Sequence, residues 1–471
     1  MKMNLIHDCI KLVFVIISLA FCKGALASSK ILPIYVSSRG SDKNIGTQKL
    51  PMKSITAALK YKRPIKLKRG DVFYESIHDD GCDISAYGNG ENPKVCGWKF
   101  VPANKGLWVE GKMINGNWIQ TCGTHIWRID LQTLLATGRI SGNNLLNNIG
   151  LIINTTTKET IGHKCEYLYA DDCIDSIRDA QTNTFVNDEN DFWQCSKKDN
   201  VKFTSEDFQY LYIYCNKDPN QYAYAFSTYG NAITVSNAKV EGVDVEGFGC
   251  HGLSCGSNVK IFHCKINHIG GSQLLGYKSW VRYGNGVEFL GPKQNGEVAY
   301  NVISYTFDCG STIQGNCGDS SYAKNIIFHD NLFHNCRQAF EIWWVKNSKT
   351  GFYHDVENCA FINNICKDNG HDNGFNSPEV HDTHILTYSI GAKTSLRIKG
   401  NKFYGGNGLL TSGYSKLLTF DNNTYYLDEG AILWTDYSGK YKIVYYKNNA
   451  NAAVKAFEHK VGGSKLKFKL R

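Results

Sequence analysis

The sequence predicts an all-β protein built as a parallel β-solenoid, and three observations support this prediction. The 471 residues include 45 Gly but only 8 Pro and 4 Met, which favours many turns between short strands over long helices. Stretches of alternating apolar residues recur from Ala238 onward, and their turn residues share a base period of 22 residues. Charged residues make up 20% and hydrophobic residues 42%, which excludes both a disordered polyelectrolyte and a bundle of membrane spans.

Residues 1–27 have the pattern of a secretory signal. Lys2 and Lys11 precede an apolar run over 12–21, and the small residues Ala25 and Ala27 mark a cleavage site. The run is shorter than the roughly 20 residues that a membrane span needs. We therefore expect a secreted or periplasmic protein without a membrane span. Loss of the signal lowers the formal net charge from +9 to +7.

Fifteen of the 17 cysteines follow the predicted signal, and export permits disulfides among them. No two cysteines have the C-x2-C spacing of a zinc site, so buried thiols or disulfides are the better interpretation. Because the count is odd, at least one thiol stays free or pairs outside the chain. The candidate pairs are Cys82/Cys96, Cys165/Cys173, Cys195/Cys215, Cys309/Cys317 and Cys359/Cys366.

The repeat that defines the solenoid is registered on seven turn residues spaced by 22, 37, 30, 33, 37 and 22 positions. They are Gly242, Cys264, Asn301, Asn331, Asn364, Asn401 and Asn423. A second short apolar run follows most of these turns, so we expect two strands in each coil. Asn suits such a corner because it tolerates left-handed backbone and its amides can hydrogen-bond from coil to coil. Unrelated hairpins are the alternative. A propeller needs blades of about 40–45 residues and a signature motif that is absent.

The start of the chain resembles a known family. Residues 34–59 are similar to the opening of bacterial right-handed parallel β-helix proteins of the pectin-lyase-like superfamily, and residues 65–73, 269–271, 282–289 and 340–344 resemble its rung and loop motifs. The resemblance implies a right-handed parallel β-helix that opens with a short capping helix. Ser54 can N-cap this helix, whose apolar face would cover the open end of the coils.

These patterns divide the chain into five parts, one of which, a β-rich insertion, does not follow the repeat. The C-terminal tail alternates like an edge strand whose lysines discourage sheet association. The expected parts are the signal 1–27, the N-terminal cap and first coils 28–111, the insertion 112–227, the solenoid coils 228–450, and the basic tail 451–471.

A binding cleft is expected where loops lengthen the coils, between Cys264 and Asn401. Equivalent residues of successive coils stack at about 4.8 Å, so insertions at one corner should build a wall of loops over one face. Aromatic side chains there suit stacking on sugar rings, although they could equally pack beneath the loops. The candidate substrate-binding residues are Trp280, Tyr283, Arg337, Trp343, Trp344, His381 and His384.

When the second apolar run of each coil is aligned with that of the next, Glu288, Thr312 and Glu341 occupy equivalent positions of consecutive coils. Two coils separate the glutamates by about 9.6 Å, with Asp308 nearby, so a glycosidase pair of carboxyl groups is one hypothesis. The alternative is that both glutamates are exposed and form ion pairs with neighbouring basic residues.

A superficial resemblance to the motifs of polygalacturonases is rejected. His251 and the segment 397–399 resemble the His-Gly and Arg-Ile-Lys motifs of polygalacturonases, whose Asp pair lies about one coil from the His. Here Asp172 lies 79 residues from His251 and outside the repeat.

The family resemblance implies a different use of the cleft. Related β-helix lyases remove the proton α to a uronate carboxylate with a Lys or Arg base, often with Ca²⁺. Lys278, Arg282 and Arg337 are candidates for the cationic roles, and Asp308 and Asp319 for calcium ligands. We therefore expect a polysaccharide lyase of acidic glycans.

Two other functions stay open: a hydrolase using Glu288, Asp308 and Glu341, and a glycan-binding solenoid without catalysis. Nucleic acid is disfavoured as a partner by export and by the lack of a basic stripe, and a monomer is expected.

Overall fold

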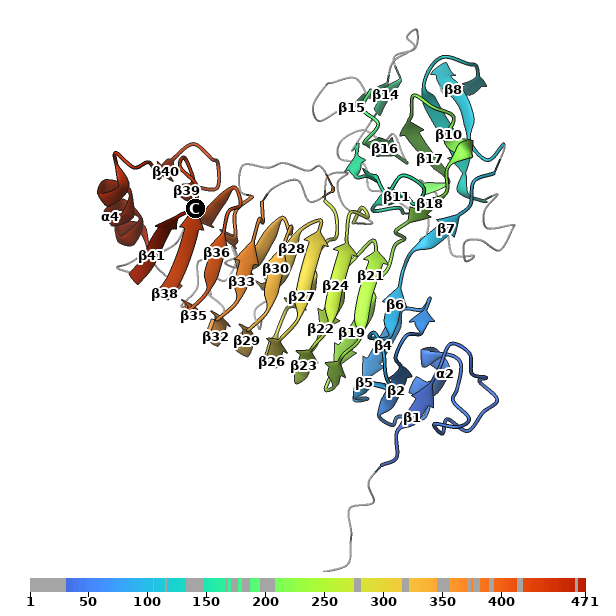
Figure 1. The fold of residues 1–471 in the computed structure, drawn as a ribbon, viewed down its shortest axis with the longest axis horizontal. Helices are drawn as coiled ribbons and strands as arrows, with labels where there is room; N and C mark the ends of the chain where they lie inside the picture. Colours follow the sequence, from blue (N-terminus) through green and yellow to red (C-terminus); the bar gives the residue numbers. More distant parts are fainter. Residues whose placement is uncertain are drawn as a thin grey trace, which may run out of the picture.

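The computed structural model describes residues 31–104, 106–114, 117–132, 148–165, 168–170, 177–179, 187–194, 208–274, 281–315, 322–344, 356–370, 374–375, 382–388, 394–412, 418–461 and 465–471. The predicted signal lies outside these residues. Among them, no helix is both long and apolar enough to cross a membrane. The chain is nearly all β, and long parallel sheets run along its length (Figure 1).

The parallel sheets form a solenoid whose coils contain three strands each, so the prediction of two strands per coil was wrong. The turn residue inside each first apolar stretch ends one strand and begins another. For example, β20 (Lys239–Glu241) and β21 (Asp244–Phe248) flank Gly242, whose φ is +64°. The handedness of the winding stays a prediction.

The bounds of the solenoid strands follow from this threefold pattern. First strands are β1 (Ile34–Val36), β2 (Ile65–Lys68), β5 (Ile84–Tyr87), β20, β23 (Val259–Phe262), β26 (Lys293–Ala299), β29 (Ala323–His329), β32 (Val356–Ile362), β35 (Thr394–Lys399) and the start of β38 (Leu418–Leu427). Second strands are β3 (Val72–Phe73), β6 (Lys94–Cys96), β21, β24 (Lys265–Ile269), β27 (Val302–Thr306), β30 (Leu332–His334), β33 (Ile365–Lys367), β36 (Lys402–Tyr404) and the end of β38. Third strands are β4 (Ile77–Asp80), β19 (Ile233–Ser236), β22 (Leu253–Cys255), β25 (Val287–Leu290), β28 (Cys309–Gly315), β31 (Gln338–Trp344), β34 (Ile385–Tyr388), β37 (Gly408–Ser412) and β39 (Ile432–Thr435), and β40 (Lys442–Val444) pairs antiparallel with β39.

A buried ladder of asparagines joins the coils at the corner between first and second strands. Its members are Asn301, Asn331, Asn364, Asn401 and Asn423, which we call the asparagine ladder. The Asn331 amide oxygen accepts hydrogen bonds from the backbone N–H and the side-chain NH₂ of Asn301, each at 3.0 Å. The stacking of amides is thus confirmed. The left-handed residue, however, is the one before each asparagine, such as Tyr300 with φ +59°.

A second, exposed asparagine ladder, not predicted from the sequence, runs along the N-terminal part of the first strands, with its members just before or within them. Asn237, Asn258, Asn295, Asn325 and Asn358 all have left-handed backbone, and their side chains are joined in series. The hydrogen bond from Asn295 Nδ2 to Asn258 Oδ1, for example, is 2.9 Å long. These residues, the outer ladder, repeat with nearly the same spacing as the buried one.

Helices cover the two ends of the solenoid. The predicted N-terminal helix is confirmed as α2 (Ile55–Leu59), because the Ser54 side chain accepts the N–H of Ala57 at 3.2 Å and Ile55 is buried. At the other end, the predicted tail contains α4 (Ala450–Lys460), which packs Phe457 against the ring of Phe420. The expected terminal strand is confirmed as β41 (Lys465–Leu470), paired with β38.

The β-rich insertion packs on the N-terminal half of the solenoid (Figure 1) and starts earlier than predicted, at β7. It consists of largely antiparallel sheets around its own apolar core, which includes Phe192 and Leu211. Ser272 of the solenoid donates a hydrogen bond to the Asn148 carbonyl at 2.5 Å, which ties the two parts together. We call this part the appended region.

The appended region contains β7 (Lys99–Val101), β8 (Val109–Ile114), β9 (Asn117–Gln120), β10 (Ile126–Asp130), β11 (Ile152–Asn154), β12 (Thr160–Ile161), β13 (His163–Lys164), β14 (Leu168–Ala170), β15 (Ile177–Asp179), β16 (Asp191–Trp193), β17 (Tyr210–Tyr214), the 3₁₀ turn η3 (Pro219–Gln221) and β18 (Tyr224–Phe226).

Two of the predicted disulfides are wrong. Cys82, Cys96, Cys359 and Cys366 are all buried free thiols. Cys359 and Cys366 belong to the apolar core of the coils, where each thiol behaves as a small hydrophobic side chain. The other three predicted pairs each include a cysteine outside the described part of the chain.

Candidate functional site

Three consecutive third strands bring the predicted carboxylates together. Glu288 of β25 pairs in register with Thr312 of β28, and Thr312 pairs with Glu341 of β31, as the spacing predicts. Glu288 is 5% exposed and Glu341 6% exposed, so the alternative of two exposed, ion-paired glutamates is wrong. Asp308 lies one residue before β28. We call Glu288, Asp308 and Glu341 the carboxylate cluster.

Glu288 accepts one hydrogen bond, from Asn285, and lies within ion-pair distance of His251 through the same oxygen. Asn285 Nδ2 lies 2.8 Å from Glu288 Oε2, and His251 Nε2 lies 3.3 Å from the same atom. The other ring nitrogen of His251 accepts the backbone N–H of Asn285 at 3.2 Å. This bond orients the His251 ring, so that Nε2 faces the Glu288 carboxylate. The carboxylate is therefore fixed as an acceptor.

Glu341 has the opposite environment, which favours its protonated form. Burial and the neighbouring charge of Asp308 raise the pKa of Glu341 to about 8, and the charge of Glu288 acts in the same direction. The Cys309 thiol lies 2.6 Å from Glu341 Oε2 and 3.5 Å from Asp308 Oδ1. Burial and both carboxylate charges raise the pKa of this thiol, so it stays protonated and donates. At neutral pH Glu341 can carry a proton to a ligand.

Both described arginines of the predicted site are engaged within the protein. Arg337 Nε lies 2.8 Å from Asp382 Oδ1, and this ion pair is buried. The Arg282 guanidinium donates to the main-chain oxygen of Lys164 in the appended region. Both guanidinium groups lie over the ring of Phe307, at 5.4 Å for Arg282 and 5.9 Å for Arg337. They thus support the segment that carries Asp308.

The predicted substrate-binding residues have different outcomes. Tyr283 lies at the site, since its ring packs edge-on against His251 at 5.2 Å. Trp344 is only 1% exposed within the solenoid core, so its predicted role in stacking on sugars is wrong. His384 is fully buried, with Nε2 3.0 Å from the Gly405 carbonyl, so its predicted role in the cleft is also wrong. Trp343 is half-buried and pairs in register with Gln314.

Several predicted residues, and parts of the predicted cleft, lie outside the described part of the chain. These residues are Lys278, Trp280, Asp319 and His381. The strand bounds show that coils lengthen at two corners, so the expectation of insertions at one corner was wrong. Long connections occur before third strands, between β24 and β25, and after them, between β31 and β32.

The sequence analysis missed three partners of the carboxylate cluster, namely His251, Asn285 and Cys309. His251 was considered only as part of the rejected polygalacturonase match. It precedes β22, the third strand paired with β25, so its position one coil before Glu288 was a usable signal. The short hydrogen bond of Cys309 to Glu341 crosses from one coil to the next and has no sequence signature.

The expectation of calcium at Asp308 does not fit its described surroundings. One ligand atom each from Asp308, Cys309 and Glu341 lies within 4.8 Å of the others. Calcium prefers a shell made only of oxygen, whereas a protonated thiol lies between these carboxyl groups. We interpret the three residues as a hydrogen-bonded set.

Comparisons with known proteins found no matching family model and no matching curated protein. Among solved structures, the chain is similar to the GH136 lacto-N-biosidase from Eubacterium ramulus, with 10% identity over 93% of this chain and 68% of that chain, at a TM-score of 0.41. It is also similar to a protein described as a glycoside hydrolase, with 8% identity over 93% and 96% at a TM-score of 0.43. A third similar structure is XylC with xylose, with 10% identity over 93% and 83% at a TM-score of 0.39. At these scores the likenesses establish neither fold nor activity, which rest here on the chain's own registers and contacts.

Proposed function

We propose that this protein is a glycoside hydrolase with Glu341 as general acid and Glu288 as the opposing carboxylate. The observation that carries the proposal is the raised pKa of Glu341, about 8, in a buried cluster with two further carboxyl groups. Glycosidases need one carboxyl group that holds a proton near neutral pH and one that does not. The surroundings of Glu341 favour its protonated form, whereas Glu288 accepts a hydrogen bond from Asn285.

In the proposed reaction, Glu341 donates its proton to the glycosidic oxygen as the bond to the anomeric carbon breaks. Glu288, fixed by Asn285 and His251, accepts a proton from the attacking water. Two coil steps place the two Cα atoms about 9.6 Å apart. From there the side chains have room to converge toward the carboxyl spacing of inverting enzymes, roughly 6.5–9.5 Å. Asp308 keeps the Glu341 proton in place and faces the positive charge that develops on the sugar.

The contacts do not favour elimination, our first expectation. A lyase would need a cationic side chain available as base. Of the two candidates in the described part of the chain, Arg337 forms a buried ion pair and Arg282 donates to the appended region. The carboxylate cluster would also repel a uronate, even though the net charge of the chain is positive. We therefore propose an uncharged glycan as substrate of an exported enzyme.

The test is to incubate the protein with a panel of neutral and uronate-containing polysaccharides and to measure both the reducing ends that are released and the ultraviolet absorbance of the products. We expect reducing ends from a neutral glycan without an unsaturated product. Glu341→Gln and Glu288→Gln should abolish release, whereas Glu357→Gln, an exposed glutamate on β32, should not. An absorbing product would instead establish elimination. Retention without cleavage would establish a binding protein. Proton NMR of the first product should show inverted anomeric configuration.

A further inference from the structure

A pocket of about 400 Å³ lies in the appended region, away from the carboxylate cluster. Its walls come from β11, β12, the turn before β16, the end of β17 and the residues that lead into β18. Its volume lies in the range of small-molecule sites. None of Glu288, Asp308 and Glu341 lines it, so any ligand bound there is held by a separate set of residues.

Tyrosine rings form the apolar part of this pocket. Tyr224 is 1% exposed and is packed from behind by Trp108, with ring centroids 5.7 Å apart. Tyr214 and Tyr222 are half-buried, and the Tyr214 hydroxyl donates to Asn216 Oδ1 at 3.2 Å. The half-buried rings of Tyr214 and Tyr222 offer rigid apolar faces with polar edges, which suit the C–H face of a sugar, whereas Tyr224 only supports the wall behind them.

Carboxylates form the polar part. Glu159, Asp188 and Glu189 are exposed at the pocket, and Lys217 is the one basic residue among its lining residues. Ionised carboxylates only accept hydrogen bonds, so they pair with ligands rich in hydroxyl donors. The excess of negative charge disfavours phosphates, uronates and other anions. An uncharged saccharide matches both the rings and the acceptors.

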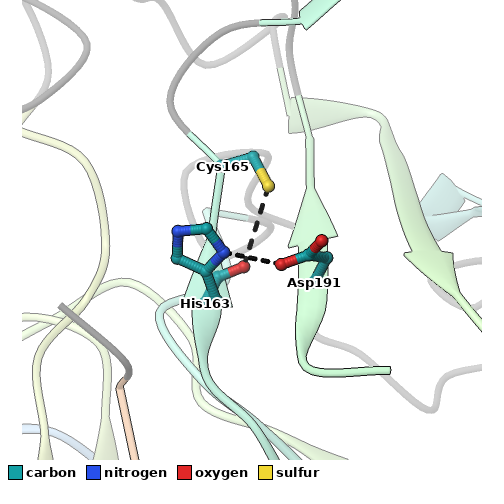
Figure 2. Close-up of side chains that lie close together, drawn as sticks. All are labelled: His163, Cys165 and Asp191. Carbon is teal, nitrogen blue, oxygen red and sulfur yellow. Dashed lines mark hydrogen bonds and ion pairs between the residues drawn. The ribbon is translucent and has the colours of Figure 1, made fainter. Parts of the chain in front are cut away.

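The wall that carries Asp188 and Glu189 is fixed by a buried carboxylate. Figure 2 shows Asp191 and His163, from the paired strands β16 and β13, pointing toward one another, with Nδ1 and Oδ1 2.6 Å apart. The other oxygen of Asp191 accepts the backbone N–H of Asp188 at 3.2 Å. Glu189 accepts the N–H of Asn216 at 3.0 Å. The pocket is thus formed before a ligand arrives, which lowers the entropy cost of binding.

We infer that this pocket is a second glycan-binding site, which holds an uncharged sugar residue of the same polysaccharide that the carboxylate cluster cleaves. The inference rests on the proposed function for the identity of the glycan, but the contacts that carry it are independent of Glu341. A second site on the appended region would retain a long chain at the enzyme and contribute little to cleavage of a short one.

The test is calorimetric titration of the full chain carrying Glu341→Gln, so that no ligand is consumed. Probes are the neutral xylohexaose, cellohexaose and lacto-N-tetraose, with hexagalacturonate and spermidine as charged comparisons. We expect binding of a neutral probe that Tyr222→Ala and Glu189→Gln each weaken at least tenfold. Tyr441→Ala, at an exposed tyrosine beside β40, is the matched control and should leave binding unchanged. Circular dichroism verifies that each variant is folded.

In the catalytically intact chain, the same two variants should raise KM for the polysaccharide and leave kcat on a short aryl glycoside unchanged. The inference is overturned if no neutral probe binds, if the pocket variants bind as tightly as the parent, or if only a charged probe is affected. If Glu341→Gln keeps its activity while the pocket variants lose binding, the proposed catalytic role fails and the second site stands.

Discussion

The asparagine ladder and the carboxylate cluster are both sets of buried polar side chains contributed by consecutive coils. In the ladder, each amide from Asn301 to Asn401 donates to the amide on the next coil, such as Asn364 Nδ2 to Asn401 Oδ1 at 3.2 Å. In the cluster, the side chains are acids that cannot all ionise side by side, and the pKa of Glu341 is raised.

The difference follows from donor and acceptor chemistry. An amide carries both donors and an acceptor, so a column of asparagines satisfies itself and stabilises the stack. Ionised carboxylates carry only acceptors and repel one another, so a column of them is stable only if it takes up protons or donors from elsewhere. A stack that serves the fold is self-complementary, whereas this cluster keeps a proton ready for transfer.

Replacement of Glu341 should give the largest effect, and it should separate the proposed catalytic role of the carboxylate cluster from the structural role of the asparagine ladder. Glu341→Gln removes the proposed acid, and we expect kcat/KM to fall by about 10²–10⁴-fold. The free energy of unfolding should not fall, because the amide is neutral at every pH and does not have to take up a proton when the chain folds. Initial rates and urea unfolding check the two effects. Loss of stability together with activity would make Glu341 a structural residue instead.

Replacement of a residue in the asparagine ladder should lower stability and leave activity unchanged. Asn331→Ala leaves the N–H and NH₂ of Asn301 without their acceptor and the Val298 carbonyl without its side-chain donor. We expect the free energy of unfolding to fall by about 3 kcal/mol, since buried unsatisfied groups cost about 1–3 kcal/mol each. Chemical denaturation measures the loss, and kcat of the surviving native protein should stay near the parent value. A loss below about 0.5 kcal/mol would contradict the structural role.

The dependence of stability and activity on pH should be a smaller and more gradual effect. Glu341 binds its proton more tightly in the folded state, at a pKa of about 8 against 4.5 for an ordinary glutamate. Its contribution to stability is therefore fully present below about pH 4.5 and is lost as the pH rises to about 8. Activity should also fall above pH 8 as the acid ionises, roughly tenfold per pH unit. Glu341→Gln should flatten the stability profile, and an unchanged profile would contradict the assignment.

The outer ladder should show the weakest effect. Asn295 is exposed to solvent and has φ +58°, so Asn295→Ala loses solvent-exposed amide contacts and places a Cβ in a disfavoured conformation. We expect a loss of about 1 kcal/mol in the free energy of unfolding. Asn295→Gly, which tolerates this backbone, is the control and should lose less. A loss equal to that of Asn331→Ala would show that burial does not distinguish the two ladders.

The sequence was sufficient for the features that repeat. The spacing of turn residues predicted the stacked amides and the common register of Glu288, Thr312 and Glu341. It did not show the third strand of each coil, because the prediction placed the short turn inside residues 240–245 within one strand, although the apolar alternation shifts by one position between Val240 and Val243. It also missed α4, although the buried residues Ala453 and Phe457 are four positions apart, as on one face of a helix.

The chemistry of the site was harder to predict. Whether an acid is protonated depends on burial and on groups from other coils, as with Cys309 beside Glu341. Likewise, Arg282 is engaged by a carbonyl 118 residues earlier in the chain, a contact that no local pattern encodes. The disulfide prediction failed at Cys82 and Cys96 because closeness in sequence does not bring two thiols together when one lies between β4 and β5 and the other is held on β6.

The third strands stay aligned although very different lengths of chain separate them. Glu288, Thr312, Glu341 and Leu386 are register partners in turn, yet intervals of 24, 29 and 45 residues lie between them. Hydrogen bonds between neighbouring strands fix the alignment, so the connections can change length without moving the reactive groups. Single loops of such a scaffold can therefore lengthen or shorten during evolution while the relative positions of Glu288 and Glu341, the proposed catalytic pair, are inherited unchanged.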